Sequence, residues 1–174
     1  MIDAECFFRK GALPLRIWMK VLVVTVLCAI AALVLDPILW HRAEGMPEPS
    51  AGLLPFFIVL SVIEAITFGL GVSFLVFGLP LVRKVSGGSG PLTWATYLSI
   101  GWLSISWWPH DNFHQSVAMG DMRGLLYIEY GFHVTLIIAG LIVAYFFLSS
   151  LRRQGYLAET HAAEPGMQKQ RQPS

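Results

Sequence analysis

Charged residues are scarce in this chain. Only 13% of its 174 residues are charged, whereas 55% are hydrophobic, and this composition excludes an ordinary soluble domain. The net charge of +1, with basic residues only in short clusters, excludes the extended basic surface that nucleic-acid binding needs. We therefore expect an integral membrane protein whose main partner is the lipid bilayer, with no nucleic acid.

Cysteine is also rare, and common catalytic signatures are missing. Cys6 lies in the N-terminal flank and Cys28 in an apolar segment, so no disulfide is expected. The sequence has no CxxC pair, no CxxCH haem attachment, no Gly-rich phosphate loop and no GxSxG elbow. These absences remove several familiar enzyme types, and nucleophilic serine chemistry is not indicated.

Long apolar runs are abundant. A helix needs about 20 residues to cross a bilayer core of about 30 Å, and the candidate spans are 17–40, 53–82, 92–108 and 124–151. We expect an all-α integral membrane protein in which four transmembrane helices form one bundle within residues 1–153. The tail, 154–174, loses its apolar character and is expected to be disordered.

Basic residues predict the topology. They cluster before the first span, after the second and after the fourth: Arg9, Lys10, Arg16, Lys20, Arg83, Lys84, Arg152 and Arg153. Because cytoplasmic flanks are enriched in Lys and Arg, we expect both termini in the cytoplasm and the connection at 107–114 outside, in a cell (inner) membrane. Ala29 and Ala31 also fit a signal-peptide cleavage pattern, but the apolar run continues to Trp40, which favours a membrane anchor.

The motif WWPHDNFH, from Trp107 to His114, is the most informative polar feature. Pro109 suits the first turn of a short interfacial helix, because its missing N–H would be unbonded there. Such a helix would place His110 and His114 on one side, facing the mouth of the bundle.

Ionisable residues also recur inside the apolar segments, where lipid makes them unfavourable. Glu129 and His133 are four residues apart in the fourth span and share a helix face, and Gly140 is expected to keep that face close to a neighbouring helix. Glu64 lies about 16 Å from the outer end of the second span, and Asp36 lies near the outer end of the first. With the expected topology they all lie in the outer half of the bundle, which predicts an extracytoplasmic polar pocket.

Imidazole and carboxylate groups are typical ligands of zinc, iron and copper. The candidate ligands of one transition metal ion are His110, His114, His133 and Glu129. The candidate catalytic carboxylates are Glu64 and Glu129, and the candidate supporting residues are Asp111 and Asp36. The patterns HExxH and paired Glu-x-x-His are absent. A metal-dependent membrane enzyme acting on a lipid-like or small substrate is thus one hypothesis.

Other interpretations remain open. Tryptophan and histidine at a membrane interface also anchor helix ends, and a buried carboxyl such as Glu64 can be protonated and bonded to another helix. Glu64, Glu129 and His133 also suit a proton relay, and His133 with an outer histidine suits a haem. An alternative is that the chain is an accessory subunit of a larger membrane complex or forms a homo-oligomer.

Overall fold

A computed structural model describes residues 15–88, 90–118 and 120–168, with side chains between 16 and 153. All regular structure in these ranges is helical. The sequence predicts that Cys6, Arg9 and Lys10 belong to a cytoplasmic flank, and these residues lie outside the described ranges. Three helices are long and apolar enough to cross a membrane: Arg16–Leu39, Leu54–Phe77 and Met122–Arg153. Their large apolar side chains are mostly exposed, which implies contact with a lipid bilayer.

The second predicted span is interrupted. Helix α3 covers Leu54–Phe77 and helix α4 covers Leu79–Ser86, with Gly78 between them. Pro80 cannot donate the backbone hydrogen bond that would continue α3, and its ring would clash with the preceding turn. Gly87, with φ +73°, ends α4 in the left-handed conformation that glycine adopts readily. The predicted span 53–82 is therefore not one continuous helix, because α3 ends at Phe77.

The third predicted span is also shorter than expected. Helix α5 covers Pro91–Ile105, and helix α6 starts at Trp107 and ends at Ser116. Pro109 has no N–H to bond to the carbonyl of Ile105, so the chain starts a new helix after Ser106. At about 1.5 Å per residue, α5 alone is roughly 22 Å long, less than a bilayer core. A fourth transmembrane helix is thus not confirmed.

The fourth predicted span is a rod of three segments: α7 (Met122–Ile128), the π-helix η1 (Glu129–Val134) and α8 (Thr135–Gln168). Asp121 caps its start by accepting hydrogen bonds from two backbone amides. The rod continues past residue 154, where the sequence predicts a disordered tail. Residues with high helix propensity follow, among them Leu157 and Ala158, and they extend a helix that already exists.

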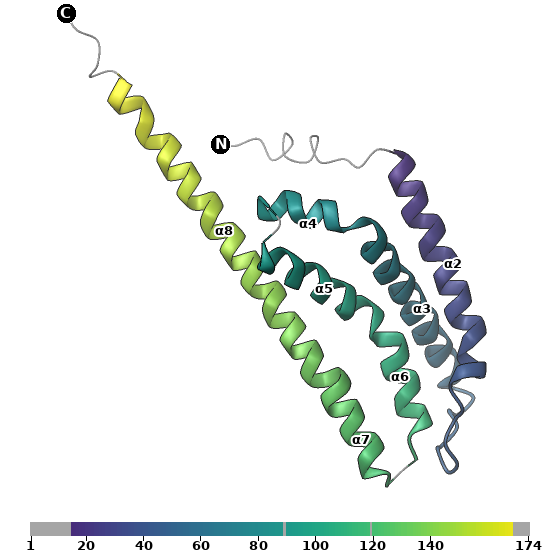
Figure 1. The fold of residues 1–174 in the computed structure, drawn as a ribbon. Coiled ribbons are helices and arrows are strands. Elements are labelled where there is room, and N and C mark those ends of the chain that lie inside the picture. Colours follow the sequence, from purple (N-terminus) through teal and green to yellow (C-terminus); the bar gives the residue numbers. More distant parts are fainter. Residues whose placement is uncertain (1–14, 89, 119, 169–174) are drawn as a thin grey trace, which may run out of the picture.

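The long helices lie in a row (Figure 1). Helix α2 (Leu15–Leu39) packs on α3, α3 on α5 and α6, and α5 on α8, so that α2 and α8 occupy opposite edges. A closed four-helix bundle is not confirmed. A row exposes more of each helix than a bundle does, and the apolar side chains on these surfaces suit lipid.

Glycines allow the close contacts in this row. A Cβ on Gly69 would overlap the backbone carbonyl of Thr25 in α2, and one on Gly71 would meet Ile105 at the end of α5. Gly140 differs, because a Cβ there would meet nothing within 4 Å. The neighbouring helix that the sequence predicts at Gly140 is therefore not present in the described part of this chain.

Candidate metal centre

Helix α6 brings two imidazoles together. Pro109 lies in its first turn, and the backbone amide of His110 bonds to the Ser106 carbonyl, 2.9 Å away. His110 and His114 are one turn apart, with ring centroids separated by 4.7 Å and ring planes perpendicular. The short helix that Pro109 predicts is thus present, and it presents both imidazoles on one side.

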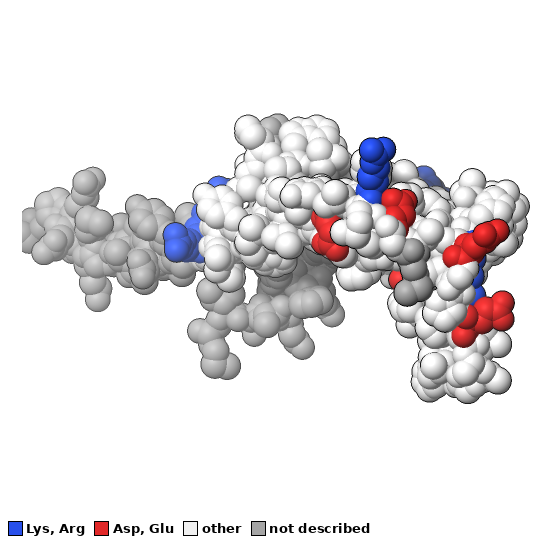
Figure 2. Space-filling model, turned by 90° about the horizontal axis from the view of Figure 1, so that it is seen from below, with Lys and Arg blue, Asp and Glu red and all other residues white. Residues whose placement is uncertain are grey.

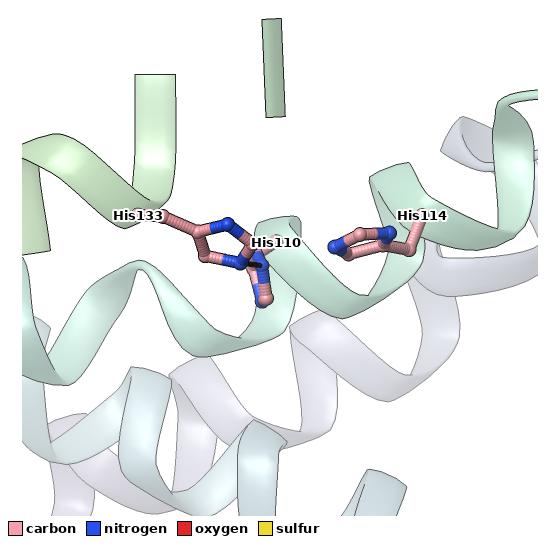
Figure 3. Close-up of side chains that lie close together, drawn as sticks. All are labelled: His110, His114 and His133. Atoms are coloured by element: carbon pink, nitrogen blue, oxygen red, sulfur yellow. Dashed lines mark hydrogen bonds between the residues drawn. The ribbon is translucent and has the colours of Figure 1, made fainter. Parts of the chain in front are cut away.

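The third imidazole comes from a distant part of the chain. His133 lies in η1, and its ring centroid is 4.9 Å from that of His110 and 5.9 Å from that of His114. One nitrogen from each of the three side chains lies within 4.8 Å of the other two. Figure 3 shows His114 from α6 turned towards the other two rings, so the three side chains form one cluster.

A chain of hydrogen bonds orders this cluster. A carboxylate oxygen of Glu129 lies 2.8 Å from Nδ1 of His133, and Nε2 of His133 lies 2.9 Å from Nε2 of His110. The carboxylate can only accept, so in neutral His133 the proton is on Nδ1 and Nε2 carries a lone pair. Nε2 of His110 therefore donates to Nε2 of His133. The lone pair on Nε2 of His133 thus points into the cluster, where it accepts this hydrogen bond.

Aromatic rings surround His110. Phe132 lies against it with centroids 5.2 Å apart, and Trp107 lies edge-on at 6.2 Å. Burial, followed by the nearby imidazoles of His114 and His133, lowers the pKa of His110. Charged carboxylates, including that of Glu129, act in the opposite direction. The lowered pKa favours the neutral form of His110, which is the form that binds a metal ion.

The cluster has nearly the dimensions of a three-histidine metal site. A tetrahedral ion bound at about 2.0–2.1 Å would hold its nitrogen ligands about 3.3 Å apart. The His110–His133 pair is slightly closer than this at 2.9 Å, and the widest separation is at most 4.8 Å. Small side-chain rotations would bring all three nitrogens to bonding distance. Three protein ligands leave a position for water or substrate, as in catalytic zinc sites.

The carboxylate of Glu129 does not face the three imidazole nitrogens, as a fourth ligand would. Its carboxylate bonds to Nδ1 of His133, on the opposite side of the ring from the nitrogen that points into the cluster. The structure thus places Glu129 behind His133, where a carboxylate would fix the orientation and basicity of an imidazole that binds a metal ion. The spacing of four residues predicts the contact between Glu129 and His133, but not this role.

The remaining candidates, Glu64, Asp36 and Asp111, lie outside the histidine cluster. Glu64 is buried in α3, with 7% of its surface exposed, and the charges of Asp111 and Asp36 both act on it. Asp36 in α2 has a buried carboxylate oxygen that finds no hydrogen-bond partner among the described residues. Glu64 is not a member of the histidine cluster. Asp111 follows His110 in sequence and lies in the same helix, α6.

Sequence reasoning missed three residues near the cluster: Trp102, Phe132 and Thr135. Trp102 donates a hydrogen bond from Nε1 to the Thr135 hydroxyl and stacks on Phe132, which in turn contacts His110. A possible signal was the position of Phe132 and Thr135 on either side of His133. Their relation to Trp102 in α5 depends on helix packing and has no local signal.

Comparison with known proteins yields no relative, since no protein-family model, curated protein or solved structure matches the chain. The case for a function is therefore made by the side chains themselves. These comprise three convergent imidazoles, a carboxylate bonded to one of them, and the separate buried carboxyl of Glu64.

Proposed function

We propose that this membrane protein binds a transition metal ion through His110, His114 and His133. The observation that carries the proposal is the convergence of three imidazole nitrogens within 4.8 Å of one another, from two separate segments of the chain. Anchoring a helix end at a membrane interface needs no such convergence. Glu129 orients His133 in this proposal, and Asp111 supports His110.

The ligand set is suited to zinc, iron or copper, all of which accept imidazole. A bound ion of this kind lowers the pKa of a coordinated water to about 7 in zinc enzymes, which permits hydrolytic chemistry near neutral pH. We propose that Glu64 holds a proton near the site, with Asp111 between it and His110. A lipid-like or small substrate would suit a centre that adjoins apolar, lipid-facing helices.

We infer that the metal centre lies at the extracytoplasmic end. Arg153 of α8 bonds to the Ser86 carbonyl at the end of α4, and Ser73 of α3 bonds to the Val21 carbonyl near the start of α2. The basic flanks of these helices therefore share one end, whereas the opposite end exposes acidic side chains with some basic ones among them (Figure 2). The positive-inside rule assigns the basic end to the cytoplasm. In this arrangement α5 and the start of α6 form the fourth crossing.

Elemental analysis by mass spectrometry tests the metal proposal on the full chain purified in detergent and incubated with zinc, iron or copper. We expect a near-stoichiometric ion in the wild type and its loss in His114→Ala and His133→Ala. His41→Ala, which changes an exposed histidine outside α2, is the matched control and should retain the ion. A wild type without an ion would overturn the proposal, and equal loss in His41→Ala would place the ion elsewhere.

A second candidate role is that of a subunit in a larger membrane assembly or a homo-oligomer. The observation that favours it is the open surface at Gly140 on α8, a helix at the edge of the row. Gly140→Leu should then lower the molecular mass of the purified assembly, measured by light scattering, while metal content stays unchanged. An unchanged mass that equals that of a single chain would contradict self-association through this surface.

A further inference from the structure

The π-helix η1 is the least regular part of the long rod. It covers Glu129–Val134, between two α-helical segments, and it contains His133 and its carboxylate partner. A π-turn is wider than an α-turn, so it changes the angle at which the following side chains leave the rod. Such turns are uncommon and less favourable than α-helix, so neighbouring groups must stabilise this one.

Thr135 supplies part of that stabilisation. Its hydroxyl lies 2.7 Å from the carbonyl oxygen of Gly131 and 3.1 Å from that of Phe132, and it donates to these two carbonyls of η1. The same oxygen accepts a hydrogen bond of 2.9 Å from Nε1 of Trp102. Thr135 thus links the π-turn to a side chain of α5, the neighbouring helix.

Trp102 stabilises the turn in a second way. Its ring stacks on Phe132, with centroids 5.9 Å apart and an angle of 9° between the planes. Phe132 in turn contacts His110 and is the residue before His133. A path of direct contacts therefore leads from α5, through Thr135 and Phe132, to the segment that carries the third imidazole.

We propose that Trp102 and Thr135 are positioning residues that hold η1 as a π-turn and so keep His133 opposite His110 and His114. This inference rests on the proposed metal centre. It assigns Trp102 and Thr135 no direct contact with the ion.

The test measures Co²⁺ affinity by titration of the purified full chain. Thr135→Val removes the hydroxyl but keeps the shape of the side chain, and we expect binding to weaken about tenfold, the effect typical of lost support behind a ligand. Thr135→Ser restores the hydroxyl and should restore affinity. Trp102→Phe, which keeps a ring against Phe132 but removes the N–H, should also weaken binding.

A matched control separates this role from general helix stability. Thr67 in α3 also donates its hydroxyl to a carbonyl one turn back, 2.8 Å away, but within a regular α-helix. Thr67→Val should leave Co²⁺ affinity unchanged. Wild-type affinity in Thr135→Val, failure of Thr135→Ser to restore binding, or equal weakening in Thr67→Val would each overturn the inference.

A second measurement needs no metal. In metal-free protein with ¹⁵N-labelled histidine, the hydrogen bond between His110 and His133 should give a nitrogen–nitrogen scalar coupling. We expect this coupling in the wild type and in Thr135→Ser, and its loss in Thr135→Val. A coupling that persists in Thr135→Val would overturn the positioning role. Failure of the wild type to bind any metal would instead overturn the proposed function, so the two failures are distinguishable.

Discussion

Two polar regions of this apolar protein use their polar atoms differently. At the α2–α3 contact, the hydroxyls of Thr25 and Ser73 bond to each other over 2.8 Å, and Ser73 also bonds to a backbone carbonyl. Both residues are buried, and Gly69 brings the two helices into close contact beside them. Polar atoms in this region are satisfied by other protein atoms, as expected where their task is to hold two helices together in lipid.

The histidine cluster is only partly closed. His133 and Glu129 expose 39% and 58% of their side chains, respectively, and the ring of His133 bonds to two ionisable side chains, those of His110 and Glu129. Its backbone is a π-turn, whereas Thr25 and Ser73 lie in regular α-helices. The comparison separates polar residues that join two helices from a cluster whose geometry is compatible with metal binding. Burial and the identity of the bonding partners distinguish the two.

Gly69→Ala should have the largest effect on stability, because the new Cβ would overlap the backbone of α2. We expect the free energy of unfolding to fall by about 1–3 kcal/mol, the usual result of overpacking. Gly140→Ala is the matched control, since its Cβ would meet nothing. It should be neutral or stabilising by up to about 1 kcal/mol. Thermal unfolding in one detergent measures both, and equal destabilisation would contradict the close packing at Gly69.

Glu129→Ala should have the opposite pattern, with a large effect on metal binding and little on stability. Removing the carboxylate behind a metal-binding histidine typically weakens binding about 10- to 100-fold. Glu129→Gln keeps an acceptor for Nδ1 of His133 and should lie between wild type and Glu129→Ala. Titration with Zn²⁺ in competition with a chelator gives the affinities, and Glu48→Gln in an exposed loop is the control. Unchanged affinity in Glu129→Ala would show that the carboxylate does not support the site.

Thr25→Val should have a smaller effect on stability than Gly69→Ala. It removes the bond to Ser73, but Ser73 keeps its bond to the Val21 carbonyl. We expect a loss of about 1 kcal/mol with no change in metal affinity. Thr67→Val, whose hydroxyl bonds within its own helix, is the control for loss of a hydroxyl. A change in metal affinity in Thr25→Val would show that the two polar regions are coupled.

Glu64→Gln should have the smallest effect. The substitution replaces a buried carboxyl with a neutral amide of similar size, which cannot ionise beside Asp36 and Asp111, so the melting temperature at neutral pH should rise slightly. Metal content should not change, because Glu64 is not a member of the histidine cluster. Loss of the ion in Glu64→Gln would contradict the separation of Glu64 from the cluster. Loss of turnover with the ion retained would support the proposed proton-holding role.

Much of the fold is predictable because hydropathy and proline are local signals. The apolar runs predict the helices, and Pro109 predicts the start of a short helix close to where α6 begins. The effect of the same proline on α5 was missed, since its lost hydrogen bond falls on Ile105, four residues earlier. The row of helices has no local signal. It depends on which small residues meet across helices, as Gly69 and Gly71 do with α2 and α5.

The sequence by itself determined the apolar helices, the basic flanks and the one-turn pairs His110–His114 and Glu129–His133, because each depends only on composition or on helical periodicity. Only the tertiary structure decided that His133 lies beside the pair on α6, that Glu129 bonds to the outer side of its ring, and that Glu64 lies outside the cluster. The physical reason is that these relations depend on the packing of α5 against α8 and on the π-turn held by Thr135. Contacts between segments that are distant in the sequence determine both the helix packing and the π-turn.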